Sequence, residues 1–270
     1  IVTGVQTCAL PISPSTASGT KKGTMPVKHH DNGAIVLRYH PQWQGRVAFN
    51  THSQEVVTRS PPWHASNMPA DYADEWTPWR DSDTARLSSW FKRELQLDLD
   101  VSACDRAIVI AADANPIHPV RDWFKSLTWD RVMRLHQFPT THLGAEASSY
   151  HARVFRWWMI AAVARTFQPG CKMDNVLILE GVQGLQKSSA LRALTGSEWF
   201  IDTPIDLHNK DAFLSLHGKL VVELAELESL KKADAGRAKA FFTSPSDTYR
   251  PPYGRRVVTV HRQCVFAGTV

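Results

Sequence analysis

Blocks of apolar and polar residues alternate along the second half of the chain. Three apolar runs rich in β-branched residues predict buried strands at 176–179, 219–224 and 263–268. Apolar residues with helical spacing predict helices at 150–167 and 233–242. Strands and helices in this order favour an α/β domain with a parallel sheet flanked by helices.

The first half of the chain has shorter blocks, which predict a small mixed region. Apolar and polar residues alternate in short runs within 33–59, and the turn residues between these runs suggest short strands. Apolar residues at i, i+3 and i+4 after Asp81 predict a helix. Further helices are expected at about 102–114 and 122–135.

These patterns divide the chain into three parts. We expect a leader at 1–26, a small α+β or helical region at 27–145 and the α/β domain at 146–270. Residues 2–12, VTGVQTCALPI, look like a translated sequencing adapter, and the Ser- and Gly-rich residues after them are typical of disorder. The competing interpretation, a secretory signal, lacks a basic segment and has too short an apolar run.

Composition narrows the class of protein only a little. The formal net charge of +5 is compatible with nucleic acid as a partner without requiring it. The cysteines beyond the leader, Cys104, Cys171 and Cys264, are widely spaced and lack metal-binding spacing, which indicates free thiols in a reducing cytoplasm. No apolar stretch approaches the roughly 20 residues of a membrane span. We therefore expect a soluble, cytoplasmic protein.

A glycine-punctuated turn follows the strand predicted at 176–179. Residues 181–189, GVQGLQKSS, lead from this strand into a helix, which is the layout of a phosphate-binding loop. Such a loop directs backbone N–H groups at a polyphosphate, while a lysine reaches the phosphates and a hydroxyl holds Mg²⁺. The predicted nucleotide contacts are Gly181, Val182, Gln183, Gly184, Leu185, Gln186, Lys187, Ser188 and Ser189.

One position departs from the usual pattern G-x-x-x-x-G-K-[ST]. Gln186 occupies the place of the second glycine, so a chance glycine-rich turn is the alternative interpretation of these residues alone. We expect Gly184 to adopt a backbone conformation that other residues avoid. Gln186 is expected to have a negative φ at the start of the helix, with its side chain turned to solvent.

Several longer segments together resemble the virulence-associated protein E family. They are NPIHPVRDW at 115–123, LEGVQGLQKS at 179–188, ELAEL at 223–227, DTYRPPYGR at 247–255 and RQCVFAGT at 262–269. The resemblance runs from about Ile35 to the C-terminus. It implies a P-loop NTPase fold similar to superfamily 3 helicases, from phages, prophages or plasmids, often linked to primases.

The resemblance also implies roles for particular residues. Lys187 and Ser188 become the contacts to ATP and Mg²⁺, and Glu223 and Glu226 become the acidic pair that holds Mg²⁺ and orients water. Both glutamates lie at the end of a predicted strand, which suits these roles, although either could be a solvated residue that begins a helix. Such a helicase has a polar sensor residue just after the last strand, where this chain ends at Thr269 and Val270, so we interpret the chain as a fragment, incomplete at the C-terminal end of its P-loop domain.

The leading hypothesis is an ATP-dependent DNA helicase or replication ATPase that acts as a homo-oligomeric ring on single-stranded DNA. Arg250, Arg255 and Arg256 lie where superfamily 3 proteins have a DNA-contacting hairpin, and their charges suit a phosphate backbone. An ordinary charged hairpin is the alternative. Two other functions stay open, a non-catalytic nucleotide-binding module of a mobile element and a small-molecule P-loop kinase.

Overall fold

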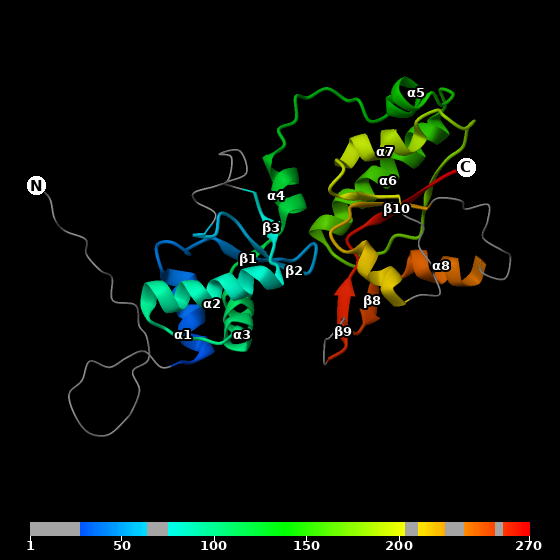
Figure 1. The fold of residues 1–270 in the computed structure, drawn as a ribbon. Helices are drawn as coiled ribbons and strands as arrows, with labels where there is room; N and C mark the ends of the chain where they lie inside the picture. Colours follow the sequence, from blue (N-terminus) through cyan, green and yellow to red (C-terminus); the bar gives the residue numbers. More distant parts are fainter. Residues whose placement is uncertain (1–27, 64–74, 203–209, 225–234, 252–255) are drawn as a thin grey trace, which may run out of the picture. The chain divides into compact units, whose positions relative to one another are not determined.

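The chain forms two compact units, which divide between His118 and Pro119 (Figure 1). The structure is a computed structural model and describes residues 28–63, 75–202, 210–224, 235–251 and 256–270. The expected leader at 1–26 lies outside these residues. The division expected between 145 and 146 falls inside the second unit, because Val120 and Phe138 already pack in the core of that unit.

The first unit combines three helices with a small sheet. The helices are α1 (His30–Tyr39), α2 (Asp81–Leu95) and α3 (Val101–Asp113). The strands are β1 (Val47–Asn50), β2 (Glu55–Thr58), β3 (Thr77–Pro78) and β4 (Pro116–Ile117), in the order β3-β2-β1-β4. All neighbours are antiparallel except β1 and β4. The predicted strands at β1 and β2 and the helices α2 and α3 are confirmed.

The short strand expected at 35–40, IVLRYH, is wrong, because residues 35–39 belong to α1 and His40 caps its end. Gly33, Val36 and Leu37 are buried at i, i+3 and i+4, which is the spacing of a helix face. A Cβ atom on Gly33 would lie 2.9 Å from the Cβ of Ala107, so a glycine lets α1 approach α3 closely. The apolar run was too short to distinguish the period of a helix, about 3.6 residues, from the period of a strand, about 2 residues.

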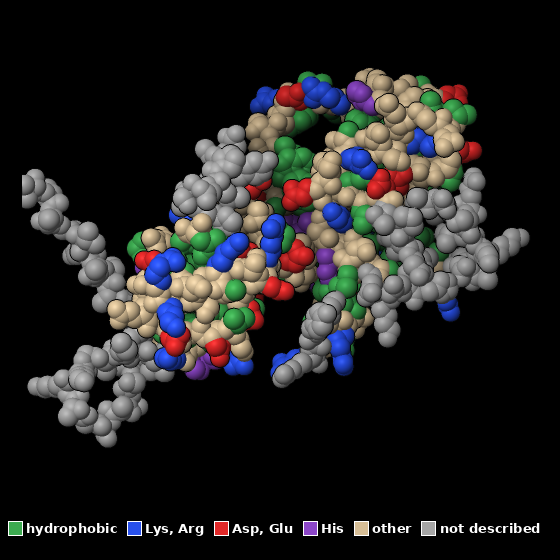
Figure 2. Space-filling model, in the orientation of Figure 1, with side chains coloured by type: hydrophobic (Ala, Val, Ile, Leu, Met, Phe, Trp, Pro, Cys, Tyr) green, Lys and Arg blue, Asp and Glu red, His purple; other side chains and the backbone are tan. Residues whose placement is uncertain are grey.

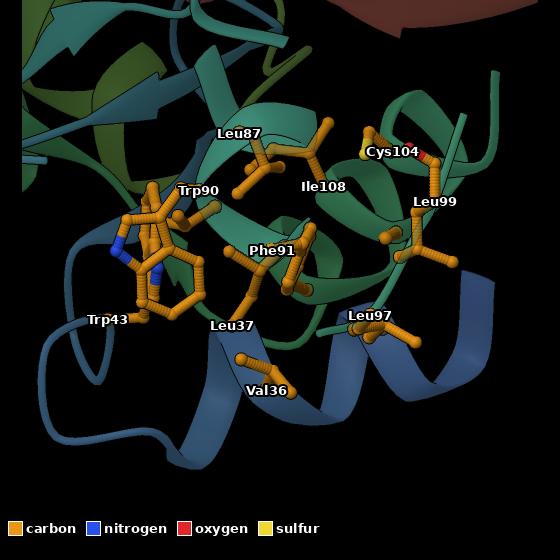
Figure 3. Close-up of a cluster of buried hydrophobic side chains, with 14 of the residues drawn as sticks. Val36, Leu37, Trp43, Leu87, Trp90, Phe91, Leu97, Leu99, Cys104 and Ile108 are labelled. Carbon is orange, nitrogen blue, oxygen red and sulfur yellow. Dashed lines mark hydrogen bonds between the residues drawn. The ribbon is translucent and has the colours of Figure 1, made fainter. Parts of the chain in front are cut away.

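Aromatic side chains fill the core of the first unit (Figure 3). Trp43 is fully buried, and its ring lies 5.2 Å from that of Trp63 and 5.6 Å from that of Trp90. Edge-to-face aromatic pairs of this kind stabilise the core beyond the effect of their buried area. The residues labelled in the close-up are Val36, Leu37, Trp43, Leu87, Trp90, Phe91, Leu97, Leu99, Cys104 and Ile108.

The second unit is a mixed α/β structure with a parallel sheet. Its helices are α4 (Pro119–Ser126), α5 (Phe138–Leu143), α6 (Ser149–Phe167), α7 (Lys187–Thr195), α8 (Ala235–Thr243) and the 3-10 helix η2 (Lys210–Leu216). Its main strands are β5 (Leu177–Leu179), β6 (Phe200–Ile201), β7 (Val221–Leu224) and β10 (Val265–Thr269). The order is β5-β10-β7-β6, with every pair parallel.

Each face of this sheet carries its own apolar core. Val221, Val265 and Ala267 pack against residues of α6 and α7 on one face. Val222 and Phe266 pack on the other face with Leu216 of η2 and aromatic residues of α8. Because both faces are covered, β7 and the first four residues of β10 are buried throughout, as their largely apolar runs predicted, and Glu223 is buried with them.

The segment between α4 and α5 differs from its prediction. We expected a helix over 122–135, but α4 ends at Ser126. The Asp130 carboxylate accepts a hydrogen bond from the backbone N–H of Val132 and a bidentate pair from Arg134. An aspartate that bonds its own neighbouring backbone competes with helix formation, which accounts for the difference.

A hairpin projects from the second unit beside α8. It consists of β8 (Ser246–Tyr249) and β9 (Val258–His261), which pair antiparallel (Figure 1). The turn residues 251–254 predict a hairpin over 249–260, and the first strand begins three residues earlier. None of the helices in the described residues is long and apolar enough to span a membrane.

Candidate functional site

The chain turns sharply between β5 and α7. We call residues 180–186 the glycine loop. Gly184 has a φ of +89°, in the left-handed region that favours glycine, as expected. The N–H of Gly181 donates to the carbonyl of Val270, and the N–H of Val270 donates to that of Leu179. The start of the loop is therefore tied to the carboxyl end of β10.

Gln186 precedes the first residue of α7, and its backbone differs from the expectation. Its φ is +55° and its ψ is 31°, which is a left-handed conformation. The expected negative φ is wrong, because the chain reverses into the helix one residue later than we assumed. The usual glycine of the pattern is thus explained by backbone sterics. The residue is exposed, in keeping with a side chain directed to solvent.

Lys187 is the first residue of α7, and its side chain turns back into the glycine loop. Its Nζ donates to the carbonyl oxygens of Gly181 and Val182, the latter at 3.2 Å. The loop backbone therefore folds around the ammonium group. This arrangement holds a positive charge beside the N-terminus of a helix, where the backbone N–H groups are also electropositive.

Ser188 connects the glycine loop to the neighbouring strands of the sheet. Its hydroxyl donates to Oε1 of Glu223 on β7 at 2.7 Å, although the two residues are 35 positions apart. Thr269, at the end of β10, donates to the same Oε1 at 2.7 Å. Glu223 is only 2% exposed. Its Oε2 is buried and accepts no hydrogen bond from the residues that the structure describes.

The sheet topology produces this cluster. Strands β5, β10 and β7 are parallel neighbours, so their carboxyl ends meet at one edge. Ligands of open parallel sheets bind outside the carboxyl ends of the strands. The sequence predicted Lys187, Ser188 and Glu223 at this edge but did not assign Thr269. The signal was present, since Thr269 follows directly on the apolar run of the last predicted strand.

The other predicted nucleotide contacts lie around this cluster. Gly181 is half-buried, whereas the loop residues 182–186 and Ser189 are exposed. Val182 and Leu185 are apolar and 73% and 62% exposed. Glu226, the second predicted acidic residue, lies outside the described residues. Its role stays a prediction.

The predicted DNA contacts lie at the far end of the β8–β9 hairpin. Arg250 follows β8 and Arg256 precedes β9, and both are exposed, whereas Arg255 lies outside the described residues. Figure 2 shows Lys or Arg side chains at the lower end of this hairpin.

The hydroxyl of Tyr249 contacts Nε2 of His217 at 3.2 Å. Burial raises the pKa of Tyr249 and lowers the pKa of His217, so this contact is between neutral groups near neutral pH.

Solved structures include chains to which this chain is similar. Twenty solved chains match, among them one described as "The apo structure of NrS-1 C terminal region (305-718)". That structure is 14% identical, with a TM-score of 0.44, and the match covers 83% of this chain and 53% of that one. This chain therefore spans about half the length of that structure.

No curated protein matches. The model of the virulence-associated protein E-like domain matches residues 124–270. The matched residues include the whole α/β sheet, the glycine loop and the β8–β9 hairpin. Because they make up more than half of the chain, the protein belongs to the virulence-associated protein E-like family, as its sequence segments predicted.

Proposed function

We propose that the protein is an Mg²⁺-dependent ATPase that acts on single-stranded DNA in the replication of a phage, prophage or plasmid, as a DNA helicase or replication ATPase. The observation that carries the proposal is that Lys187 and Ser188, which follow β5, and Glu223, on β7, meet at the carboxyl edge of the parallel sheet, with β10 between the two strands. These groups come from the loop helix and a separate strand, and they supply a cation for the phosphates and two oxygen ligands for Mg²⁺.

The polyphosphate would lie in the glycine loop at the N-terminus of α7. The first N–H groups of a helix lack partners within the helix and favour an anion, and Lys187 adds a full positive charge. The backbone at Gly184 is open, with nothing within 4 Å of the position of a Cβ atom, so a phosphate can approach it closely. ATP is accordingly the proposed ligand.

The residues beside the loop suit Mg²⁺, which prefers oxygen ligands. The Ser188 hydroxyl and the Glu223 carboxylate are within hydrogen-bond distance of each other, and Oε2 of Glu223 is buried without a donor among the described residues. A buried carboxylate oxygen in this state is costly, and a cation nearby lowers that cost. When bound, Mg²⁺ neutralises charge on the phosphates, and we assign its contacts to Ser188 and Glu223.

Water orientation for hydrolysis is assigned to the acidic pair Glu223 and Glu226, as the family resemblance implies. Thr269 holds Oε1 of Glu223 from the neighbouring strand, while Ser188 holds it from the loop helix. We therefore assign Thr269 a positioning role, since its hydroxyl fixes the carboxylate that faces the nucleotide.

The hairpin is proposed to contact single-stranded DNA through Arg250, Arg255 and Arg256. Exposed guanidinium groups neutralise backbone phosphates and release counterions without reading sequence. We further propose a homo-oligomeric ring in the full-length protein, with a primase domain or partner, because the family resemblance implies both. The ring size and the direction of movement stay open.

A second candidate is a non-catalytic nucleotide-binding module. One observation favours it, the left-handed backbone of Gln186, where a non-glycine residue is strained. Such a protein would bind ATP without turning it over. The two candidates therefore differ in hydrolysis and agree in binding.

The test is ATP hydrolysis by the full-length protein, with and without single-stranded DNA, beside the Lys187→Ala variant. We expect Mg²⁺-dependent hydrolysis that DNA stimulates and that the variant lacks. Binding of ATP without hydrolysis would favour the non-catalytic module. Hydrolysis that DNA leaves unchanged would remove the helicase function and favour the kinase alternative.

A further inference from the structure

The β8–β9 hairpin has an unusual base. Two-stranded hairpins are marginal in water and normally need an apolar face packed against a neighbour. In this hairpin the one fully buried residue of either strand is a carboxylate, Asp247, at 5% exposure. The other residues of both strands are half-buried or exposed. Beside the partly buried contact of Tyr249 with His217, the buried anchor of the hairpin is therefore a carboxylate and not an apolar side chain.

The partner of Asp247 is Arg262, which directly follows β9 and is 3% exposed. Its Nε donates to Oδ2 of Asp247 at 2.7 Å, and its Nη2 donates to Oδ1 at 2.6 Å. Its Nη1 donates to the carbonyl of Phe241 on α8. The guanidinium lies 4.4 Å from the centre of the Phe241 ring and 5.6 Å from that of Phe266. Arg262 therefore joins the hairpin to α8 and to β10.

The backbone around Arg262 is held as firmly as its side chain. The N–H of Arg262 donates to the carbonyl of Pro245 at 3.0 Å, and its own carbonyl accepts from Gly170 at 2.9 Å. Two residues later, the carbonyl of Cys264 accepts from the buried guanidinium of Arg165 at 2.9 Å. β10 begins at the next residue and ends at Thr269, which contacts Glu223. One fixed segment thus connects the hairpin to the central strand of the candidate site.

A buried ion pair is weak evidence for stability, so we consider its effect on orientation. The desolvation of two charges offsets most of their attraction, so apolar residues of similar volume often stabilise a protein equally well. Two parallel hydrogen bonds between a guanidinium and a carboxylate, however, fix the relative orientation of the two side chains. Contacts between apolar side chains are not directional and fix it less closely. We therefore expect this pair to fix the orientation of the hairpin more than to raise the free energy of unfolding.

We propose that the Asp247–Arg262 pair is a positioning device that sets the orientation of the β8–β9 hairpin on the sheet and so presents Arg250 and Arg256 to single-stranded DNA. The part that concerns DNA rests on the proposed function. The part that concerns orientation does not, and it is measurable without DNA. Asp247 and Arg262 touch no nucleic acid in this scheme and act through the hairpin.

The test replaces both charges together, as Asp247→Leu with Arg262→Met, in the full-length protein. This double variant removes both charges of the pair together, and the buried Arg165 nearby keeps its carbonyl partners while it loses one attractive and one repulsive neighbour. We therefore expect a melting temperature within a few degrees of the parent and unchanged ATP hydrolysis without DNA. Single-stranded DNA affinity and the stimulation of hydrolysis by DNA should fall about tenfold or more. The matched control is Arg192→Met with Asp202→Leu, an ion pair of the same length that is about half exposed and belongs to α7 and the residue after β6. It should leave DNA affinity unchanged.

A distance measurement makes the outcome independent of DNA binding. Spin labels at Val257 and Ile178, which are 58% and 46% exposed, report the position of the hairpin relative to β5. The background replaces Cys8 and Cys171 by serine and keeps the buried Cys104 and Cys264. The distance distribution should be narrow in the parent and broad in the double variant. An unchanged distribution, or full DNA affinity with a broadened one, would overturn the proposal, whereas a parent that binds no DNA would overturn the proposed function alone.

Discussion

Thr269 on β10 donates a hydrogen bond to Glu223 on β7, with 2.7 Å between Oγ1 and Oε1. The contact crosses two adjacent parallel strands and uses the same oxygen that Ser188 contacts from the loop helix. Glu223 is consequently held from two sides, and its second oxygen stays without a protein donor among the described residues. The carboxylate has one fixed orientation before any nucleotide binds.

Thr269→Val tests this relationship, because valine keeps the shape of threonine and removes the donor. A hydrogen bond to a charged group contributes about 1.5–3 kcal/mol. We expect ATP affinity within a few-fold of the parent and hydrolysis slowed by roughly tenfold or more. The control is Thr269→Ser, which keeps the hydroxyl and should hydrolyse ATP close to the parental rate. Equal rates in the valine and serine variants would show that the contact is only structural.

Lys187→Ala removes the positive charge around which the glycine loop folds. ATP affinity should fall by at least about tenfold and hydrolysis should be lost, because the phosphates lose their main cationic partner. Thermal unfolding should change little, because the two hydrogen bonds of the side chain go to carbonyls of a largely exposed loop, where water can replace the donor. Lys172→Ala is the matched control, because its side chain is 82% exposed and it lies before β5. Normal ATP binding by Lys187→Ala would contradict the assignment of the loop.

Glu223→Gln and Glu226→Gln separate binding from hydrolysis. Each variant should keep ATP affinity, since the loop and Lys187 remain, and at least one should lose hydrolysis with the charge that holds Mg²⁺ or orients water. Isothermal titration with a slowly hydrolysed ATP analogue measures the affinity, and phosphate release measures the rate. If both variants hydrolyse ATP at the parental rate, the acidic pair is structural.

Arg250→Ala with Arg256→Ala tests the hairpin as a DNA-binding element. Single-stranded DNA affinity should weaken about equally for all sequences, and the slope of log K against log salt should decrease by about 0.7 for each phosphate that the variant no longer neutralises. Arg153→Ala with Arg156→Ala removes two exposed charges from α6 and serves as the control. A salt slope unchanged by the hairpin substitutions would locate the DNA site elsewhere.

The pattern along the chain predicted the elements that are buried on both faces. β7 and most of β10 form the centre of the sheet, and their apolar runs have one interpretation only, because the sheet buries both of their faces. α1 was missed because its short apolar run matches the period of a helix and that of a strand equally well. The close approach of Gly33 to α3, which requires the helix, is visible only in the structure. The local pattern of this short segment therefore did not decide between helix and strand.

The candidate site was predictable where one segment carries the chemistry. Lys187 and Ser188 follow a glycine-rich turn, so the sequence alone assigns them as candidate contacts to a nucleotide. The hydrogen bond from Thr269 to Glu223 spans 46 positions, and only the order of strands in the sheet brings these side chains together. The Asp247–Arg262 pair was missed for the same reason, since an aspartate within a polar hairpin gives no sign that it is buried.

Gln186→Gly tests whether the departure from the usual loop pattern has a functional cost. Glutamine in the left-handed region is strained by about 1–2 kcal/mol in the folded state, and glycine removes this strain. Glycine also raises the conformational entropy of the unfolded chain, which offsets roughly half of the gain. The free energy of unfolding should therefore rise by about 0.5–1 kcal/mol. Gln96 offers a matched control, because its φ of 53° and ψ of 23° nearly equal those of Gln186 and it ends α2 in the other unit. Gln96→Gly should give a similar gain in stability with no effect on nucleotide binding.

The effect of Gln186→Gly on ATP decides between the two proposed functions. The strain at Gln186 is present with and without nucleotide, and its side chain is exposed, so it should largely cancel in the binding equilibrium. We expect ATP affinity to change by less than about tenfold, which is roughly 1.4 kcal/mol, with the hydrolysis rate within the same range. Fluorescent-nucleotide titration and phosphate release, compared with Gln96→Gly, measure both. An affinity gain of several hundredfold, or hydrolysis that appears only in the glycine variant, would show that the natural loop is degenerate and would favour the non-catalytic module over the helicase.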